Sequence, residues 1–401
     1  MTALESRTAI EALRAGVPNR TAVRLLGSTE DAIETAFDDG LAAAWQPGPG
    51  LLVAGGFGTG KSHLLGYLRE IALRDNFVVS WVTASKETPL GTPRLVFAAA
   101  MRSAMVPGHN DDAITAALAE LQRVEGAVQR LELWASTPAA GLSPVFAAIL
   151  HLLSRQLDAD FLRQIEAFLA GGKLPGAALR QALAQAGARG KFDLRVAGEA
   201  LLLTQRQRFM PELFRAAGFA GWCVLIDEVE LIGRYGRLQR ARAYAELARW
   251  LGLEAGSRAP GLYATAAITD DFADGVINRR QDREKLPELL QLKGQPQQAR
   301  LAAIAMRAIE RATLLRPPSD DDLRRHEATL RLHYGAAYGW GAPALDPGER
   351  RSDRTMRHHI RGWITQWDML RLHGSAAAID VEEHRLTYEE DPDLAEPDAE
   401  A

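Results

Sequence analysis

The sequence has little cysteine and no long apolar run, and each of these properties excludes a class of structure. Cys223 is the only cysteine among 401 residues, so the chain forms no internal disulfide. No apolar run approaches the ~18 residues that a membrane-spanning helix needs. The N-terminal stretch MTALESRTAIEALRAG contains acids, unlike a secretory signal. We therefore expect a cytoplasmic protein with no membrane partner.

Lysine is also scarce, since six lysines occur and the other basic residues are arginines. The whole chain has a formal net charge of −4, yet residues 380–401 carry ten acids against Arg385, so the remainder is net positive. A mildly basic body permits contact with DNA without requiring it, and coding bias toward arginine and alanine is the plainer explanation of the composition. We expect the acidic tail, 380–401, to be largely disordered.

Apolar runs and helical periodicity alternate along the chain. Two helical stretches fill most of residues 1–48, with a break at residues 16–19. Strands are expected at 51–54, 77–83, 222–226 and 261–268, separated by helical segments. Such alternation predicts an α/β fold with a parallel sheet.

Two regions are helical only. Residues 95–215 are far too long for a normal connection between strand and helix, so they form a helical insertion within a core spanning 49–297. Residues 298–379 are expected to form a separate helical domain, with one helix over 300–315 and another over 355–372. On that last helix, Trp363, Trp367 and Leu370 share one face, as core residues do.

The strongest motif is a phosphate-binding loop of the pattern G-x-x-x-x-G-K-[ST]. It follows an expected strand and opens an expected helix, as this motif requires. Glycines let backbone N–H groups approach phosphate oxygens closely, and the helix N-terminus adds positive potential. A lysine then contacts the β- and γ-phosphates and a serine hydroxyl reaches Mg²⁺. The residues are Gly55, Gly56, Phe57, Gly58, Thr59, Gly60, Lys61 and Ser62, and we add the adjoining His63 to the ATP contacts.

A second acidic motif ends the strand expected at 222–226. Four apolar residues precede Asp227 and Glu228, which is the pattern of a Walker B strand. A buried parallel strand delivers its last residue to the edge of the sheet where ligands bind. Asp227 is thus predicted to hold Mg²⁺, and Glu228 to polarise the attacking water.

Candidates for sensing the γ-phosphate come from later segments. Thr269 ends the strand at 261–268 and is the first choice, with Asp270 as the alternative; a strand-end turn explains both equally well. Arg357 and Arg361 are four residues apart and share a helix face. The arginines at 279–283 are an alternative source of a transition-state contact in a neighbouring subunit, and a solvated basic face is the plainer interpretation of either group. His358 and His359 have no ligand partners at metal spacing and are interpreted as surface or packing residues.

Several stretches taken together resemble a known family. They are RAGVPNR (14–20), GGFGTGKSHLL (55–65), SKETPL (85–90), VLIDEVELIGRYGRLQRARAYAELARWL (224–251) and YEEDPDL (388–394). These resemble the ATP-binding P-loop proteins of bacterial BREX phage-defence systems, the BrxD-like group. That group looks like a divergent AAA+/STAND branch of P-loop NTPases.

The resemblance to this family implies roles for residues and partners that the sequence patterns alone do not predict. It implies that Val17 and Pro18 line the adenine pocket, that the helices after 298 form a lid, and that Arg357 or Arg361 is the sensor on it. It also implies other defence-system proteins as partners, working beside a DNA methyltransferase.

Three functions remain open at this point. The first is an ATP-hydrolysing switch or motor in a DNA-associated defence complex, with a homo-oligomer as one candidate assembly. The second is a loader or remodeller of DNA replication proteins, which requires salt-dependent DNA binding. The third is a scaffold that holds ATP without turnover; the adjacent Asp227 and Glu228 argue against it.

Overall fold

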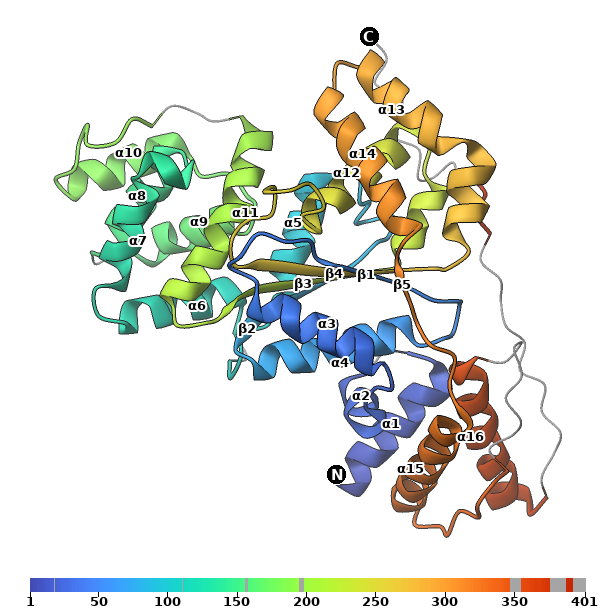
Figure 1. Ribbon diagram of the computed structural model, residues 1–401. Helices are drawn as coiled ribbons and strands as arrows, with labels where there is room; N and C mark the ends of the chain where they lie inside the picture. The colour runs from blue at the N-terminus through green and yellow to red at the C-terminus, as the bar shows by residue number, and fades with distance from the viewer. Residues whose placement is uncertain are drawn as a thin grey trace.

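The computed structural model describes residues 1–17, 19–109, 111–155, 158–194, 198–346, 355–375 and 387–391. At its centre lies a parallel sheet of five described strands in the order β2-β3-β4-β1-β5 (Figure 1). The strands are β1 (Leu51–Ala54), β2 (Phe77–Thr83), β3 (Gly221–Asp227), β4 (Leu262–Ile268) and β5 (Thr313–Leu314). The α/β fold class predicted from the sequence is therefore confirmed.

Helices cover both faces of the sheet, which explains why β1, β3 and β4 are almost entirely buried and mostly apolar. Side chains alternate between the faces along a strand, so Trp222 and Val224 join one core while Cys223 and Leu225 join another. The Cys223 face is covered by α3 (Asp31–Ala42) and α4 (Lys61–Arg74). The Trp222 face packs on α5 (Pro93–Arg102), α12 (Arg237–Trp250), α13 (Asp282–Leu292) and α14 (Pro296–Ile309).

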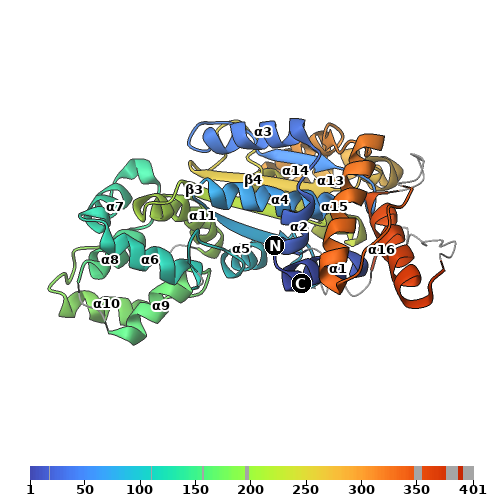
Figure 2. The same ribbon diagram turned by 90° about the horizontal axis from the view of Figure 1, so that it is seen from below.

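The long segment between β2 and β3 is helical, as its composition predicted. After α5 its helices form a lobe beside the β2 edge of the sheet, seen in two views (Figures 1 and 2). They are α6 (Ala113–Arg123), α7 (Ala127–Ala135), η1 (Pro138–Ala140), α8 (Pro144–Leu153), α9 (Ala159–Leu169), α10 (Gly176–Gln185) and α11 (Glu199–Ala216).

Helices from the two ends of the described chain pack together as one unit, which we call the terminal helical unit. It contains α1 (Ala3–Ala15), α2 (Arg20–Leu26), α15 (Asp320–Tyr338) and α16 (Met356–His373), and lies on the side of the sheet opposite α12–α14 (Figure 1). Ile10, Leu323 and Trp367 meet in its fully buried core. Trp363 is buried there too, so both tryptophans of the predicted face are core residues, whereas Leu370 is half-buried and lies outside this cluster.

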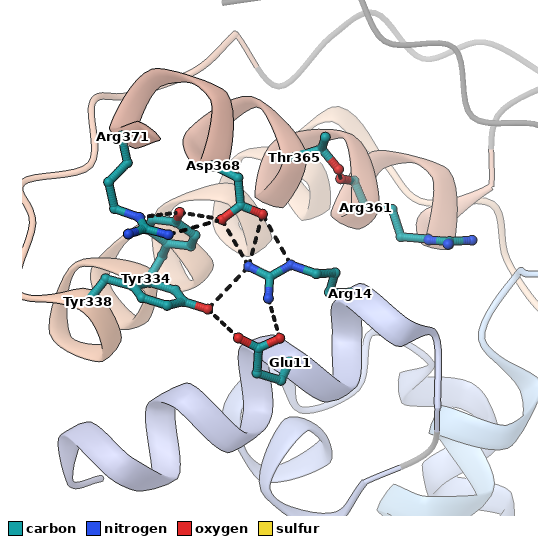
Figure 3. Close-up of polar contacts among 8 residues, drawn as sticks. All are labelled: Glu11, Arg14, Tyr334, Tyr338, Arg361, Thr365, Asp368 and Arg371. Carbon is teal, nitrogen blue, oxygen red and sulfur yellow. Dashed lines mark hydrogen bonds and ion pairs between the residues drawn. The ribbon is translucent and has the colours of Figure 1, made fainter. Parts of the chain in front are cut away.

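A polar network also joins these helices (Figure 3). Arg14 on α1 donates two hydrogen bonds to the Asp368 carboxylate on α16, at 2.9 and 3.1 Å. The Tyr334 hydroxyl donates to the same carboxylate at 2.6 Å, and the Tyr338 hydroxyl donates to Glu11 at 2.6 Å. The network therefore ties α1 to both C-terminal helices.

The structure differs from the sequence analysis after residue 298. The helix expected over 300–315 ends at Ile309, and the chain then enters β5, which pairs with β1. The strand was missed because it has two exposed residues and follows a helical apolar pattern without interruption. The helix α14 packs on α12 and α13, whereas α15, which begins at Asp320, packs on α1.

Two further elements complete the edge of the sheet where the strands end. The short helices η2 (Val229–Arg234) and η3 (Ala273–Asn278) follow β3 and β4 respectively. Residues 387–391 lie against them, with the Asp391 N–H donating to the Arg234 carbonyl at 3.0 Å. In the described part of the chain, every helix is too short or too polar to span a bilayer.

Candidate functional site

A cavity opens where the carboxyl ends of the strands face the terminal helical unit. Its walls come from the loop between β1 and α4, the end of β3, the segments around α2 and the start of α16. The lining includes Gly16, Val17, Asn19, Gly27, Phe57, Gly58, Thr59, Gly60, Lys61, Ser62, His63, Asp227, Glu228, Glu230, Arg316, His326, Met356, Arg357 and Ile360. Most of the predicted site residues therefore meet in one place.

The loop after β1 has the conformation that its glycines permit. Gly58 and Gly60 have φ values of +78° and +109°, in the region that favours glycine. Gly60 directly precedes α4, so the helix N-terminus points into the cavity wall. The Lys61 amine, which is buried, donates to the carbonyls of Gly55 at 3.0 Å and Gly56 at 3.2 Å. The lysine thus folds back over its own loop.

Asp227 and Ser62 lie beside this lysine. The Ser62 hydroxyl hydrogen-bonds the Asp227 carboxylate, which also accepts the Glu228 N–H at 3.0 Å. Burial raises the pKa of Asp227, while the bonds from Ser62 and Glu228 and the charge of Lys61 oppose that rise. The loop and the end of β3, far apart in the chain, therefore converge on one point.

Glu228 is next to this point and has an unusual backbone. Its φ of +57° is in the left-handed region, uncommon for a residue with a side chain. Burial and the neighbouring Asp227 raise the pKa of Glu228, and Lys61 and Arg357 lower it. Two cations from different parts of the chain therefore act on this carboxyl.

Glu230 is a site residue that the sequence analysis missed. Its carboxylate is 3.7 Å from the Lys61 amine, and the whole residue is 8% exposed. Burial raises the pKa of Glu230 to about 7, although Lys61 opposes this. No local sequence signal distinguishes Glu230, because an acid two positions after Glu228 is as compatible with an exposed surface turn as with a buried site.

Thr269 follows β4, and β4 lies between β1 and β3 in the sheet. Thr269 is buried and lies outside the lining of the cavity. Its hydroxyl is 2.6 Å from the Tyr388 hydroxyl. Asp270, the alternative, lies by the loop: a Cβ on Gly56 would be 3.8 Å from one of its carboxylate oxygens. Asp270 is thus near the loop, whereas the Thr269 hydroxyl is engaged by Tyr388.

The two candidate arginines of α16 differ in position. Arg357 lines the cavity, its guanidinium lies 4.9 Å from the centroid of the Phe57 ring, and its N–H donates to the Gly58 carbonyl at 3.3 Å. Arg361 is absent from the lining, and its side chain extends away from the Arg14–Asp368 network (Figure 3). Of the arginines at 279–283, Arg280 pairs instead with Glu390 and Arg283 with Glu310.

The opposite end of the cavity is formed around α2. Val17 lines it, whereas Pro18 lies outside the described residues. Burial lowers the pKa of His63, so its neutral ring donates from Nε2 to the Gly27 carbonyl at 2.8 Å. This bond fixes the loop after α2 against α4.

The donor set fits a magnesium ion bound together with a nucleotide. Among the described residues, no group of three His, Cys, Asp or Glu side chains could hold a metal alone. Mg²⁺ needs few protein ligands when phosphate oxygens and waters complete its octahedron. The adjacent Ser62 hydroxyl and Asp227 carboxylate supply such oxygen ligands.

One of three comparisons with known proteins gives a match. Neither the curated proteins nor the solved structures contain a match to the chain. A family model described as BREX system ATP-binding protein BrxC/D matches residues 1–136 and 146–314, which include the loop after β1 and Asp227. The match covers most of the chain and confirms the resemblance drawn from the sequence. The chain therefore belongs to the BREX system ATP-binding protein BrxC/D family.

Proposed function

We propose that the chain is a Mg²⁺-dependent ATPase that works as a nucleotide-driven switch or motor in its defence system. One observation carries the proposal: Lys61, Ser62 and Asp227 converge beside a cavity at the carboxyl edge of the sheet. The family name supplies ATP binding and the BREX context. A P-loop NTPase of the AAA+/STAND type is the fold that best accounts for this combination.

The phosphates would lie against the loop from Gly55 to Ser62, at the N-terminus of α4. Lys61 would exchange its bonds to the loop carbonyls for phosphate oxygens. Ser62 and Asp227 would hold Mg²⁺, which neutralises phosphate charge when bound. Glu228, whose pKa is raised by burial, would orient and polarise the attacking water.

The terminal helical unit is the proposed lid. Its α16 begins against the phosphate-binding loop, where Arg357 contacts both Phe57 and Gly58. Arg357 is the preferred sensor over Arg361, because it lines the cavity. Val17 would contribute to the adenine side. Lid closure can act on partner proteins only if ATP binds one lid position more tightly than the other. A complete change of population requires a difference in binding free energy of ~5.5 kcal/mol.

The experiment is to measure ATP binding and phosphate release for the full chain and three variants. Lys61→Ala should weaken binding at least tenfold, whereas Glu228→Gln should retain binding and lose at least a hundredfold in turnover. Glu288→Gln, an exposed acid on α13, is the control and should match the wild type. Undiminished turnover in Glu228→Gln would contradict the assigned role.

The same assay, together with a measurement of DNA binding at several salt concentrations, separates the other functions. Wild-type protein that binds ATP and releases no phosphate would favour a scaffold that holds ATP. Salt-dependent binding of single- or double-stranded DNA would favour a loader of replication proteins. Other defence proteins remain the partners that family membership suggests, and direct DNA contact and homo-oligomer formation stay predictions.

A further inference from the structure

The segment Thr387–Asp391 occupies a groove between η2, η3 and the end of β4. Its tyrosine fits a space that two glycines leave open. A Cβ on Gly233 would lie 2.8 Å from the Tyr388 ring, and one on Gly275 would lie 3.1 Å from it. The Phe272 ring packs edge-on against the tyrosine, with centroids 5.7 Å apart. The groove is therefore shaped for an aromatic side chain.

Cations surround the rest of the segment. Glu390 lies 3.2 Å from a guanidinium nitrogen of the buried Arg240 and 3.4 Å from Arg280. Asp391 lies 2.8 Å from Arg234 and 3.3 Å from Lys86. Backbone contacts add to these pairs: Arg280 also donates to the Tyr388 carbonyl, and Asp391 bonds the backbone of Arg234. An acidic peptide with one tyrosine thus matches the groove in shape and charge.

The Tyr388 hydroxyl also belongs to a chain of hydrogen bonds at the end of β4. It lies 2.6 Å from both the Asp271 carboxylate and the Thr269 hydroxyl. A carboxylate only accepts, so the single Tyr388 proton goes to Asp271. Thr269 must then donate its own proton to Tyr388. While the segment is docked, the Thr269 hydroxyl has no proton left for a phosphate oxygen.

We propose that this groove is a docking site for an acidic, tyrosine-bearing peptide, that residues 387–391 of the same chain are its occupant, and that docking competes with the γ-phosphate for the Thr269 hydroxyl. The competition rests on the proposed ATPase function and on Thr269 as a sensor. The docking itself rests only on the contacts of the groove.

The test uses the full chain and two readouts. Hydrogen–deuterium exchange measures docking at residues 387–391, and ATP turnover at subsaturating ATP measures competition. Tyr388→Phe removes the hydroxyl and keeps the ring, whereas Gly275→Ala crowds the ring from the groove side. Tyr67→Phe, which alters a half-buried tyrosine on the opposite face of the sheet, is the control.

Both groove variants should raise exchange at 387–391, and turnover should rise roughly three- to tenfold, the effect of one hydrogen bond. A non-hydrolysable ATP analogue with Mg²⁺ should raise the same exchange in the wild type, and the control should change neither readout. Unchanged exchange in both groove variants overturns the docking site, whatever the ATPase result. Raised exchange without faster turnover overturns the competition alone. A wild type that binds no ATP defeats the proposed function, and the exchange of the two variants still decides the docking.

Discussion

The substitution Glu230→Gln gives a sharp test of how the cavity is built. Glu230 is almost fully buried beside Lys61, and burial raises the pKa of its carboxyl from 4.5 to about 7. Glutamine keeps the shape of the side chain and resembles the protonated acid at every pH. The variant therefore removes one titration and leaves the packing nearly unchanged.

The pKa difference sets the sign and size of the effect. Below pH 4.5 the carboxyl is neutral in both the folded and unfolded states, so Glu230 then carries no penalty. As pH rises from 4.5 to about 7, the unfolded state releases the proton first, and the free energy of unfolding falls. At about 1.4 kcal/mol per pH unit the loss amounts to roughly 3 kcal/mol above pH 7.

Urea denaturation of the wild type and Glu230→Gln across pH 4.5–8 measures this loss. The two free energies of unfolding should agree near pH 4.5, and the variant should be more stable by up to roughly 3 kcal/mol at pH 8. Glu288→Gln, at an exposed position, should follow the wild type throughout. Parallel profiles for Glu230→Gln and wild type would refute the reasoning.

Three other changes test the packing around the cavity. Gly58→Ala should destabilise the protein by about 1–2 kcal/mol, because the φ angle of Gly58 is +78°. It should also weaken ATP binding, because the added Cβ would lie 2.9 Å from a side chain at the start of α16. The control Gly187→Ala, where φ is +73° and no atom lies within 4 Å of the added Cβ, should show only the backbone effect on stability. Trp367→Ala should lower the free energy of unfolding by about 3–5 kcal/mol, since the ring is fully buried in the terminal helical unit; a loss below about 1 kcal/mol would contradict that packing. A double-mutant cycle of Arg14→Gln and Asp368→Asn should give a coupling of roughly 1 kcal/mol, modest because both side chains are partly exposed; strict additivity would mean that the network in Figure 3 does not join the helices.

The features that the sequence predicted well are local ones. The loop from Gly55 to Ser62 and the strand that ends at Asp227 each combine an apolar run with chemically distinctive residues. The rule that parallel strands end at one edge then brings the two together without further information. The tryptophans of α16 were predicted as core for the same reason, from periodicity within one helix.

The features that were missed depend on distant contacts. Nothing in residues 1–26 indicates that α1 and α2 pack on α15 and α16, since any amphipathic helix could cover them. The burial of Glu230 depends on the turn of η2, and the position of residues 387–391 depends on a groove made by other segments. The start of α12 is likewise hard to place from the sequence, because the buried Arg240, paired with Asp282, interrupts its apolar pattern.

The most direct test of the central claim is calorimetric binding of a non-hydrolysable ATP analogue, with and without Mg²⁺. The claim is that Ser62 and Asp227 hold a metal ion that also contacts the nucleotide on Lys61. Mg²⁺ should tighten binding to the wild type at least tenfold and have little effect on binding to Asp227→Asn. Equal Mg²⁺ dependence in the two proteins would contradict the account.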